Sequence, residues 1–158
     1  MEKIKPCLWF DHEGEEAARF YMSIFRNSKI VEVIRNGEDG PGPEGSVLAM
    51  TVSLDGRDVM ILNGGPTYRI TPAISLFVGC ENQAEIDDLW SKLTSGGGAP
   101  VQCGWLTDKF GVSWQIAPTA LMHMIADKDP ARAKRAMQAM MQMVKLDLAA
   151  LQAAYDDA

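Results

Sequence analysis

Two stretches of this chain repeat the same order of apolar segments, and this repeat constrains the fold more than any other feature. In each, an apolar run with a proline near its start (Pro6, Pro72) leads into a segment whose apolar residues recur at steps of three and four. That order predicts a strand followed by an amphipathic helix. The dipeptides at 20–21 and 89–90 lie at similar offsets within the two helices. We interpret the repeat as an internal duplication.

Further strands complete each copy as a βαβββ module. The expected strands are residues 4–10, 29–35, 47–54 and 57–62 in the first copy and 72–78, 101–105 and 112–117 in the second. Asp55-Gly56 is typical of a hairpin turn. The expected fold class is therefore α+β, a single domain over residues 1–158 with paired modules at 1–66 and 67–118 and C-terminal helices at 119–158.

The last forty residues have no counterpart in the first copy. Asp129-Pro130 predicts a helix start, and the helix is expected to run to about Tyr155. Its apolar stripe consists of Met137, Met140, Met141, Val144, Leu148, Leu151 and Tyr155. Such a stripe needs a cover, and two covers stay open: the same domain, or a second subunit in a homodimer.

Charge and cysteine content exclude several classes of function. A formal net charge of -6 leaves no basic field for nucleic acid. The chain has three cysteines, an odd number, and all of them lie within apolar runs: Cys7, Cys80 and Cys103. This pattern favours reduced thiols and a cytoplasmic location. The sequence has neither a signal-peptide core nor an apolar stretch of the roughly 20 residues that span a bilayer. We therefore expect a soluble protein without membrane partners.

The string from Asp108 to Ile116, Asp-Lys-Phe-Gly-Val-Ser-Trp-Gln-Ile, carries a family resemblance. With Trp9-Phe10, residues 18–21 and the tail at 118–155, it resembles the PhnB-like branch of the vicinal oxygen chelate superfamily (glyoxalase, bleomycin resistance, dioxygenase). The resemblance implies two βαβββ modules around a small-molecule cavity. Members often carry the label 3-demethylubiquinone-9 3-methyltransferase. The sequence offers no glycine-rich turn between a strand and a helix for S-adenosylmethionine.

The resemblance also permits a test for a metal site. Metal-dependent members place ligands on the first, fourth, fifth and last strands, which here correspond to Pro6, to Met60 or Leu62, to Ala73 and to Gln115. Transition metals need several nitrogen, sulfur or oxygen ligands, usually histidine and carboxylate. Gln115 alone keeps an oxygen donor, so we expect no metal and no cofactor.

Strand alternation then suggests which side chains line the cavity. Ser113 shares a face with Gln115, whereas Trp114 is expected in the core. Leu8 and Leu62 are also expected on the wall, and loop residues near its mouth could set specificity. The candidate ligand-binding residues are Gln115, Ser113, Ser75, Phe77, Phe10, Met60, Asn63, Tyr68, Arg69 and Trp105.

Three functions remain open. The first is metal-free binding of a small molecule in the cavity. The second is an enzyme: a metal-dependent lyase, isomerase or dioxygenase with ligands at other positions, a metal-free catalyst that uses Gln115, or the methyltransferase of the family label. The third is an interaction module that docks through its methionine-rich tail. Asp108 and Lys109 are interpreted as turn residues, because an Asp-x-x-Gly turn accounts for both Asp108 and Gly111.

Overall fold

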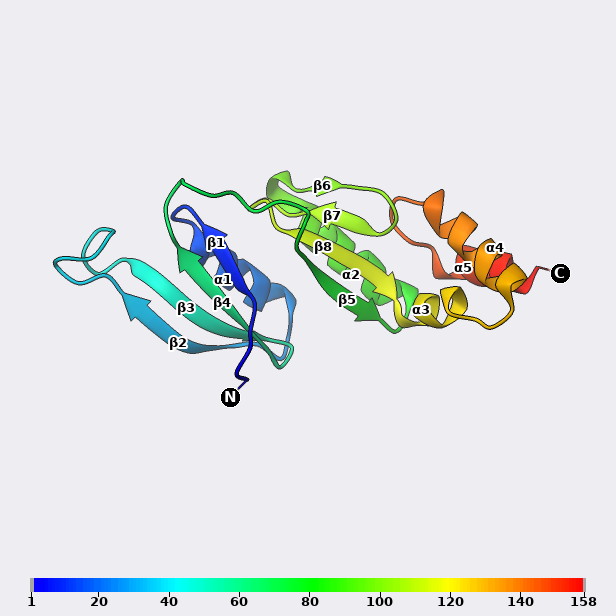
Figure 1. Ribbon diagram of the computed structural model, residues 1–158, viewed down its shortest axis with the longest axis horizontal. Coiled ribbons are helices and arrows are strands. Elements are labelled where there is room, and N and C mark those ends of the chain that lie inside the picture. Colours follow the sequence, from blue (N-terminus) through cyan, green and yellow to red (C-terminus); the bar gives the residue numbers. More distant parts are fainter. Residues whose placement is uncertain (1, 158) are drawn as a thin grey trace. The chain divides into compact units, whose positions relative to one another are not determined.

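The computed structural model describes residues 2–157, and the chain folds as two compact units that meet between Ile70 and Thr71. Each unit has its own four-stranded sheet with a helix behind it (Figure 1). The spatial order of strands is the same in both: the first strand of the unit pairs in parallel with the last, and the two middle strands follow. This shared topology supports the duplication.

The first unit consists of β1 (Cys7–Phe10), α1 (Gly14–Ile24), β2 (Lys29–Arg35), β3 (Val47–Leu54) and β4 (Arg57–Asn63). The sheet order is β1-β4-β3-β2, with β1 parallel to β4 and the other pairs antiparallel. Asp55 and Gly56 make the β3–β4 turn, both with positive φ, as a two-residue hairpin requires. β1 begins three residues later than the apolar run predicts.

Helix α1 covers one face of the first sheet, and Gly14 permits its close approach. A Cβ at Gly14 would lie 2.7 Å from the side chain of Ile61. Leu8 is the pairing partner of Ile61, and Phe10 follows two residues later, so both lie on this helix-covered face, where they are buried. The expectation that Leu8 and Phe10 line a cavity was therefore wrong: both belong to the core under α1.

The second unit starts with β5 (Ser75–Cys80) and α2 (Gln83–Thr94), and continues through a 3-10 turn η1 (Ser95–Gly97), β6 (Ala99–Pro100), β7 (Trp105–Thr107) and β8 (Ser113–Pro118). The sheet order is β5-β8-β7-β6. Asn82 caps α2 by accepting a hydrogen bond from the Glu85 N–H. The buried residues of α2 are Ile86, Leu89 and Leu93, which repeat at helical spacing as predicted.

Three helices end the second unit: α3 (Thr119–Ile125), α4 (Pro130–Met141) and α5 (Leu148–Asp156). The expected single helix from 130 to 155 was wrong, because residues 142–147 leave the helix. Leu146 in this connection is fully buried, and Asp147 caps α5 by accepting from the Ala150 N–H. A helix through this segment would give up both interactions.

The helices of the tail share a hydrophobic core with one another and with the end of β8. Its buried members are Ala117, Leu121, Met124, Ala136, Leu146 and Leu151, with Met140, Leu148 and Tyr155 packed against them. Part of the predicted stripe is therefore covered within the same unit. Met122, Met137, Met141 and Val144 keep large exposed areas.

Candidate functional site: the open sheet face of the second unit

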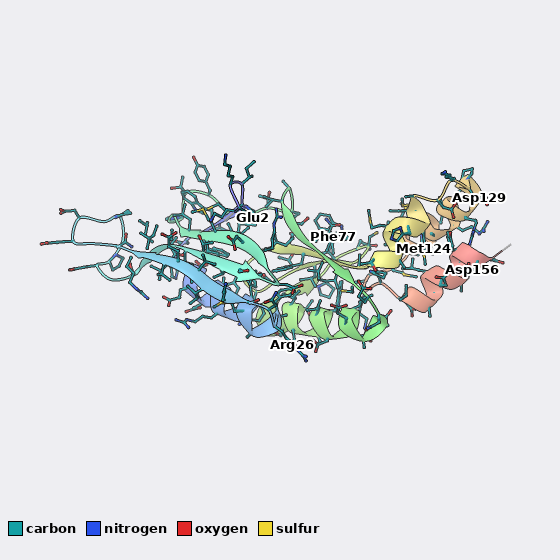
Figure 2. The ribbon with its side chains drawn as sticks, turned by 90° about the horizontal axis from the view of Figure 1, so that it is seen from below. Glu2, Arg26, Phe77, Met124, Asp129 and Asp156 are labelled. Atoms are coloured by element: carbon teal, nitrogen blue, oxygen red, sulfur yellow. The ribbon has the colours of Figure 1, made fainter. Side chains whose placement is uncertain are left out.

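The face of the second sheet opposite α2 carries an ordered set of polar and aromatic side chains. Phe77 pairs with Gln115, and Gln115 pairs in turn with Trp105, so these three lie in one row across β5, β8 and β7. Ser75, Ser113 and Thr107 form the next row in the same way. Figure 2 shows Phe77 projecting from the sheet on the side away from α2. We call these six residues the open face of the second unit.

Gln115 is the central polar group of this face. Its amide Nε2 donates a hydrogen bond to the Ser75 hydroxyl at 3.0 Å. Both side chains are partly exposed, whereas Ser113 beside them is buried. The amide oxygen of Gln115 and the hydroxyl proton of Ser75 give the pair both an acceptor and a donor for a ligand.

Two aromatic residues flank this polar pair. Phe77 is 50% exposed, although it lies in the interior of a strand, and Trp105 is half-buried on the other side of Gln115. Sites for organic molecules are lined mainly by apolar and aromatic side chains with a few convergent polar groups. The open face offers side chains of both kinds: two aromatic residues and one hydrogen-bonding pair.

The Asp108–Gly111 turn joins β7 to β8, the strands that carry Trp105 and Gln115. The Asp108 carboxylate accepts hydrogen bonds from the Phe110 N–H (2.8 Å), from the Val112 N–H (3.1 Å) and from the indole of Trp114 (2.9 Å). Asp108 is buried, and Trp114 lies in the core as expected. The interpretation of Asp108 as a turn residue agrees with these contacts.

The remaining candidates belong to the first unit. Met60 lies on the face opposite α1, together with Trp9 and Leu62, as strand pairing requires. Tyr68, 66% exposed, contacts the Trp9 ring edge-on with centroids 5.0 Å apart, and Arg69 next to it is exposed. The Trp9 indole donates to the Gly65 carbonyl at 2.9 Å. Sequence reasoning missed Trp9, because alternation places it opposite Leu8 and Phe10 without showing which of the two faces the helix covers.

Asn63 has a different environment. Its side chain accepts from the Gly14 N–H (2.8 Å) and donates to the Val47 carbonyl (3.0 Å), so both amide atoms serve the structure. Asn63 also borders a cavity of about 470 Å³ in the first unit, walled by the β2–β3 loop, the end of β4 and the turn after β1. Asn36 of that loop, also missed from sequence, is 7% exposed, and its Oδ1 has no hydrogen-bond partner among residues 2–157.

The donor set does not fit a metal ion of the kind that the fold family implies. Within residues 2–157 no group of three or more histidine, cysteine, aspartate or glutamate side chains is close enough to hold one. Partial desolvation of its thiol raises the pKa of Cys7. The His12 ring is exposed, 3.6 Å from Asp11 and 3.8 Å from Glu13. The His12 backbone N–H lowers the pKa of Glu13.

Each of the two βαβββ units has the same strand order, with one helix-covered and one open sheet face. The chain belongs to the PhnB-like family: the family model described as 3-demethylubiquinone-9 3-methyltransferase matches residues 2–117. The methyltransferase name is the description of the family. No curated protein matches this chain.

Solved structures agree with this assignment. A PhnB protein from Bacillus cereus is 40% identical, with a TM-score of 0.67 over 74% of this chain and 98% of its own. Protein PA1353 from Pseudomonas aeruginosa is 21% identical, with a TM-score of 0.61 over 75% and 98%. The fosfomycin resistance protein FosX from Listeria monocytogenes is 14% identical, with a TM-score of 0.50 over 75% and 94%. The last two are similar in fold alone.

The turns before the helices bear on the methyltransferase label. The turns that join a strand to the helix after it are Asp11–Glu13 before α1 and Glu81-Asn82 before α2, and neither contains glycine. A glycine-rich turn at this position is what brings a nucleotide phosphate or cofactor close to a helix N-terminus.

Among the helices of residues 2–157, none combines the length and apolarity needed to cross a bilayer.

Proposed function

We propose that this protein binds a small organic molecule on the open face of the second unit, without a metal ion. The observation that supports it best is the row Phe77–Gln115–Trp105: a hydrogen-bonding amide between two accessible aromatic residues on adjacent strands. Phe77 offers an exposed apolar ring, and the Gln115–Ser75 pair offers a hydrogen-bond acceptor and a donor beside it. A ligand of mixed character contacts both.

The accessible face of the first unit adds to this proposal. Trp9, Met60 and Tyr68 offer a second apolar surface, and Arg69 offers a cation for a ligand with a carboxylate or phosphate. We propose these as secondary binding residues, together with Asn63 at the edge of the cavity in the first unit.

Location and assembly belong to the same proposal. All three cysteines are free, in keeping with a reducing, cytoplasmic compartment. The exposed methionines of the tail, Met122 and Met141 foremost, suit contact with a second copy, and sedimentation of the full chain measures whether it is a homodimer.

Thermal-shift screening tests the binding proposal. The purified chain is heated with divalent metals and with a panel of aromatic and carboxylate metabolites, and a ligand that binds the folded state raises Tm. We expect stabilisation by an organic compound and none by metals. Gln115→Ala and Phe77→Ala should abolish that stabilisation, whereas Gln152→Ala, which removes a single exposed hydrogen bond in α5, should retain it.

Metal analysis supplies the opposing outcome. Stoichiometric divalent metal in protein that was purified without chelator or affinity tag would overturn the metal-free proposal. Stabilisation that survives Gln115→Ala and Phe77→Ala alike would place the ligand elsewhere in the molecule. Turnover of a stabilising compound, lost on Gln115→Ala, would make the protein a catalyst rather than a binder.

A further inference from the structure

The C-terminal extension, residues 119–157, lies outside the part of the chain that the family model matches. The family model ends at residue 117, and the Bacillus cereus protein is covered over 98% of its length while this chain is covered over 74%. The family match therefore rests on the two βαβββ units. The contacts of the extension show what it adds.

The α4–α5 connection, residues 142–147, is bonded to the turn that precedes β7. The Cys103 N–H donates to the Met143 carbonyl and the Gly104 N–H to the Val144 carbonyl, both at 2.8 Å. These two bonds occupy consecutive amides immediately before Trp105 of the open face. The turn therefore takes its hydrogen-bond partners from the extension.

The turn has a backbone conformation that needs such support. Cys103 has φ +58° and Gly104 φ +82°, and a non-glycine residue in the left-handed region is unfavourable by itself. Leu146 packs directly on Gly104, where a Cβ would lie 2.9 Å from its Cδ1. The Gly104 carbonyl also accepts from the Ile116 N–H at 2.8 Å, next to Gln115. The turn thus connects the extension to both Trp105 and Gln115.

Side chains of α2 anchor the same connection. Gln83 donates to the Leu146 carbonyl at 3.0 Å and accepts from the Leu148 N–H at 2.8 Å, so its amide holds the backbone on both sides of Asp147. Lys145 pairs with Asp87, one turn further along α2, at 2.8 Å. The connection is held from two sides, by the turn and by α2.

From these contacts we infer that the C-terminal extension positions Trp105, and with it one edge of the open face, by holding the Cys103–Gly104 turn in its left-handed conformation. The inference rests on the proposed function for the role of Trp105 in binding, but the positioning itself does not. Gln83, Lys145 and Leu146 are its positioning residues; none of them belongs to the open face.

Hydrogen exchange tests the positioning. The variant Gln83→Ala/Lys145→Ala removes both side-chain anchors and leaves the hydrophobic core of the tail intact. We expect exchange at the amides of Cys103, Gly104 and Trp105 to rise about tenfold, the ratio that corresponds to one lost hydrogen bond. Exchange within α1 should not change. The control is Lys92→Ala, which removes the Asp88 ion pair at the other end of α2. Unchanged exchange at all three amides would overturn the inference.

A binding cycle separates this inference from the proposed function. The probe is 8-anilino-1-naphthalenesulfonate, a dye that binds accessible apolar surface. If Trp105 contributes to the open face, Trp105→Ala weakens dye binding. The variant Gln83→Ala/Lys145→Ala, called the anchor variant, should weaken dye binding about threefold or more. Combined with Trp105→Ala, it should cause no further loss of dye affinity.

The outcomes of the two experiments are distinct. Dye affinity that is unaffected by Trp105→Ala contradicts the proposed face, while faster exchange at Cys103–Trp105 still supports positioning. Dye affinity that depends on Trp105 but not on the anchors supports the face and overturns the inference.

Discussion

The buried carboxylate of Asp108 accepts a hydrogen bond from the indole N–H of Trp114 at 2.9 Å, across the turn that joins β7 to β8. The same carboxylate accepts two backbone N–H groups, so one side chain satisfies three donors. The aspartate of the Asp108–Ile116 string, which carries the family resemblance, therefore has a structural role in the β7–β8 turn.

We therefore expect Asp108→Ala to be strongly destabilising. It removes the acceptor of three hydrogen bonds, from Phe110, Val112 and Trp114, and the loss of a buried acceptor costs about 1–3 kcal/mol for each donor that it served. Urea unfolding should show a loss of about 3 kcal/mol or more. Lys109→Ala, at the exposed neighbouring position, serves as the control and should change the free energy of unfolding little. Similar values for the two variants would contradict the role of Asp108.

The extension should be most stable between acid and strongly alkaline pH. The Tyr155 hydroxyl donates to the Asp127 carboxylate, and this bond lowers the pKa of Asp127 and raises that of Tyr155. A lowered carboxyl pKa contributes stability above its unfolded value, which is lost as pH falls through the folded pKa, below about pH 4. A raised tyrosine pKa contributes stability that is lost as pH rises above about 10.

Tyr155→Phe removes the titration of the tyrosine and the largest of the causes that lower the pKa of Asp127. Its thermal stability should depend less on pH at both ends than that of the parent chain, as measured by circular dichroism from pH 3 to 11. A pH dependence identical to that of the parent would show that this hydrogen bond does not contribute.

The thiols of Cys7 and Cys80 should differ in reactivity. Cys80 is buried, and loss of hydration raises its pKa to about 12, so it stays protonated at neutral pH. Cys7 is exposed, although partial desolvation raises the pKa of its thiol as well. Mass spectrometry after brief iodoacetamide treatment at pH 8 should find Cys7 modified and Cys80 unmodified, with Cys80 reacting only in denaturant. Rapid native labelling of Cys80 would contradict its burial.

Gly64 is expected to tolerate no side chain. A Cβ there would lie 2.4 Å from the Trp9 ring, which is itself held by its bond to Gly65 and by Tyr68. Gly64→Ala should therefore displace Trp9 and lower the free energy of unfolding by about 1–3 kcal/mol. Gly37→Ala is the matched control, because a Cβ at Gly37 meets nothing within 4 Å. Equal stability of the two variants would mean that Trp9 moves without cost.

Local pattern determined most of the secondary structure. The helical spacing in residues 83–94 predicts α2 with the bounds that the structure has, and the Asp108–Gly111 turn follows from turn chemistry alone. Gln115 on the open face of the second unit also follows, because strand alternation separates it from Trp114. These features depend on neighbours within a few residues.

Alternation could not decide which face of β1 the helix covers. It places Leu8 and Phe10 on one side and Trp9 on the other, but all three are apolar. The choice depends on pairing with Ile61 in β4, more than fifty residues away, and on the approach of α1 at Gly14. From the sequence alone, a side chain of β1 that lines a cavity cannot be distinguished from one that lies in the core under α1, because the distinction depends on this pairing.

The tail shows the same division. The sequence by itself determined that a helix starts at Pro130 and that the tail needs an apolar cover, because side chains at steps of three and four make one stripe. Only the tertiary structure decided that the helix breaks at 142–147, because Gln83 and the Cys103–Gly104 turn bond to the backbone there and Leu146 enters the core. Helical periodicity is a local property, whereas these partners are brought to the segment by the fold.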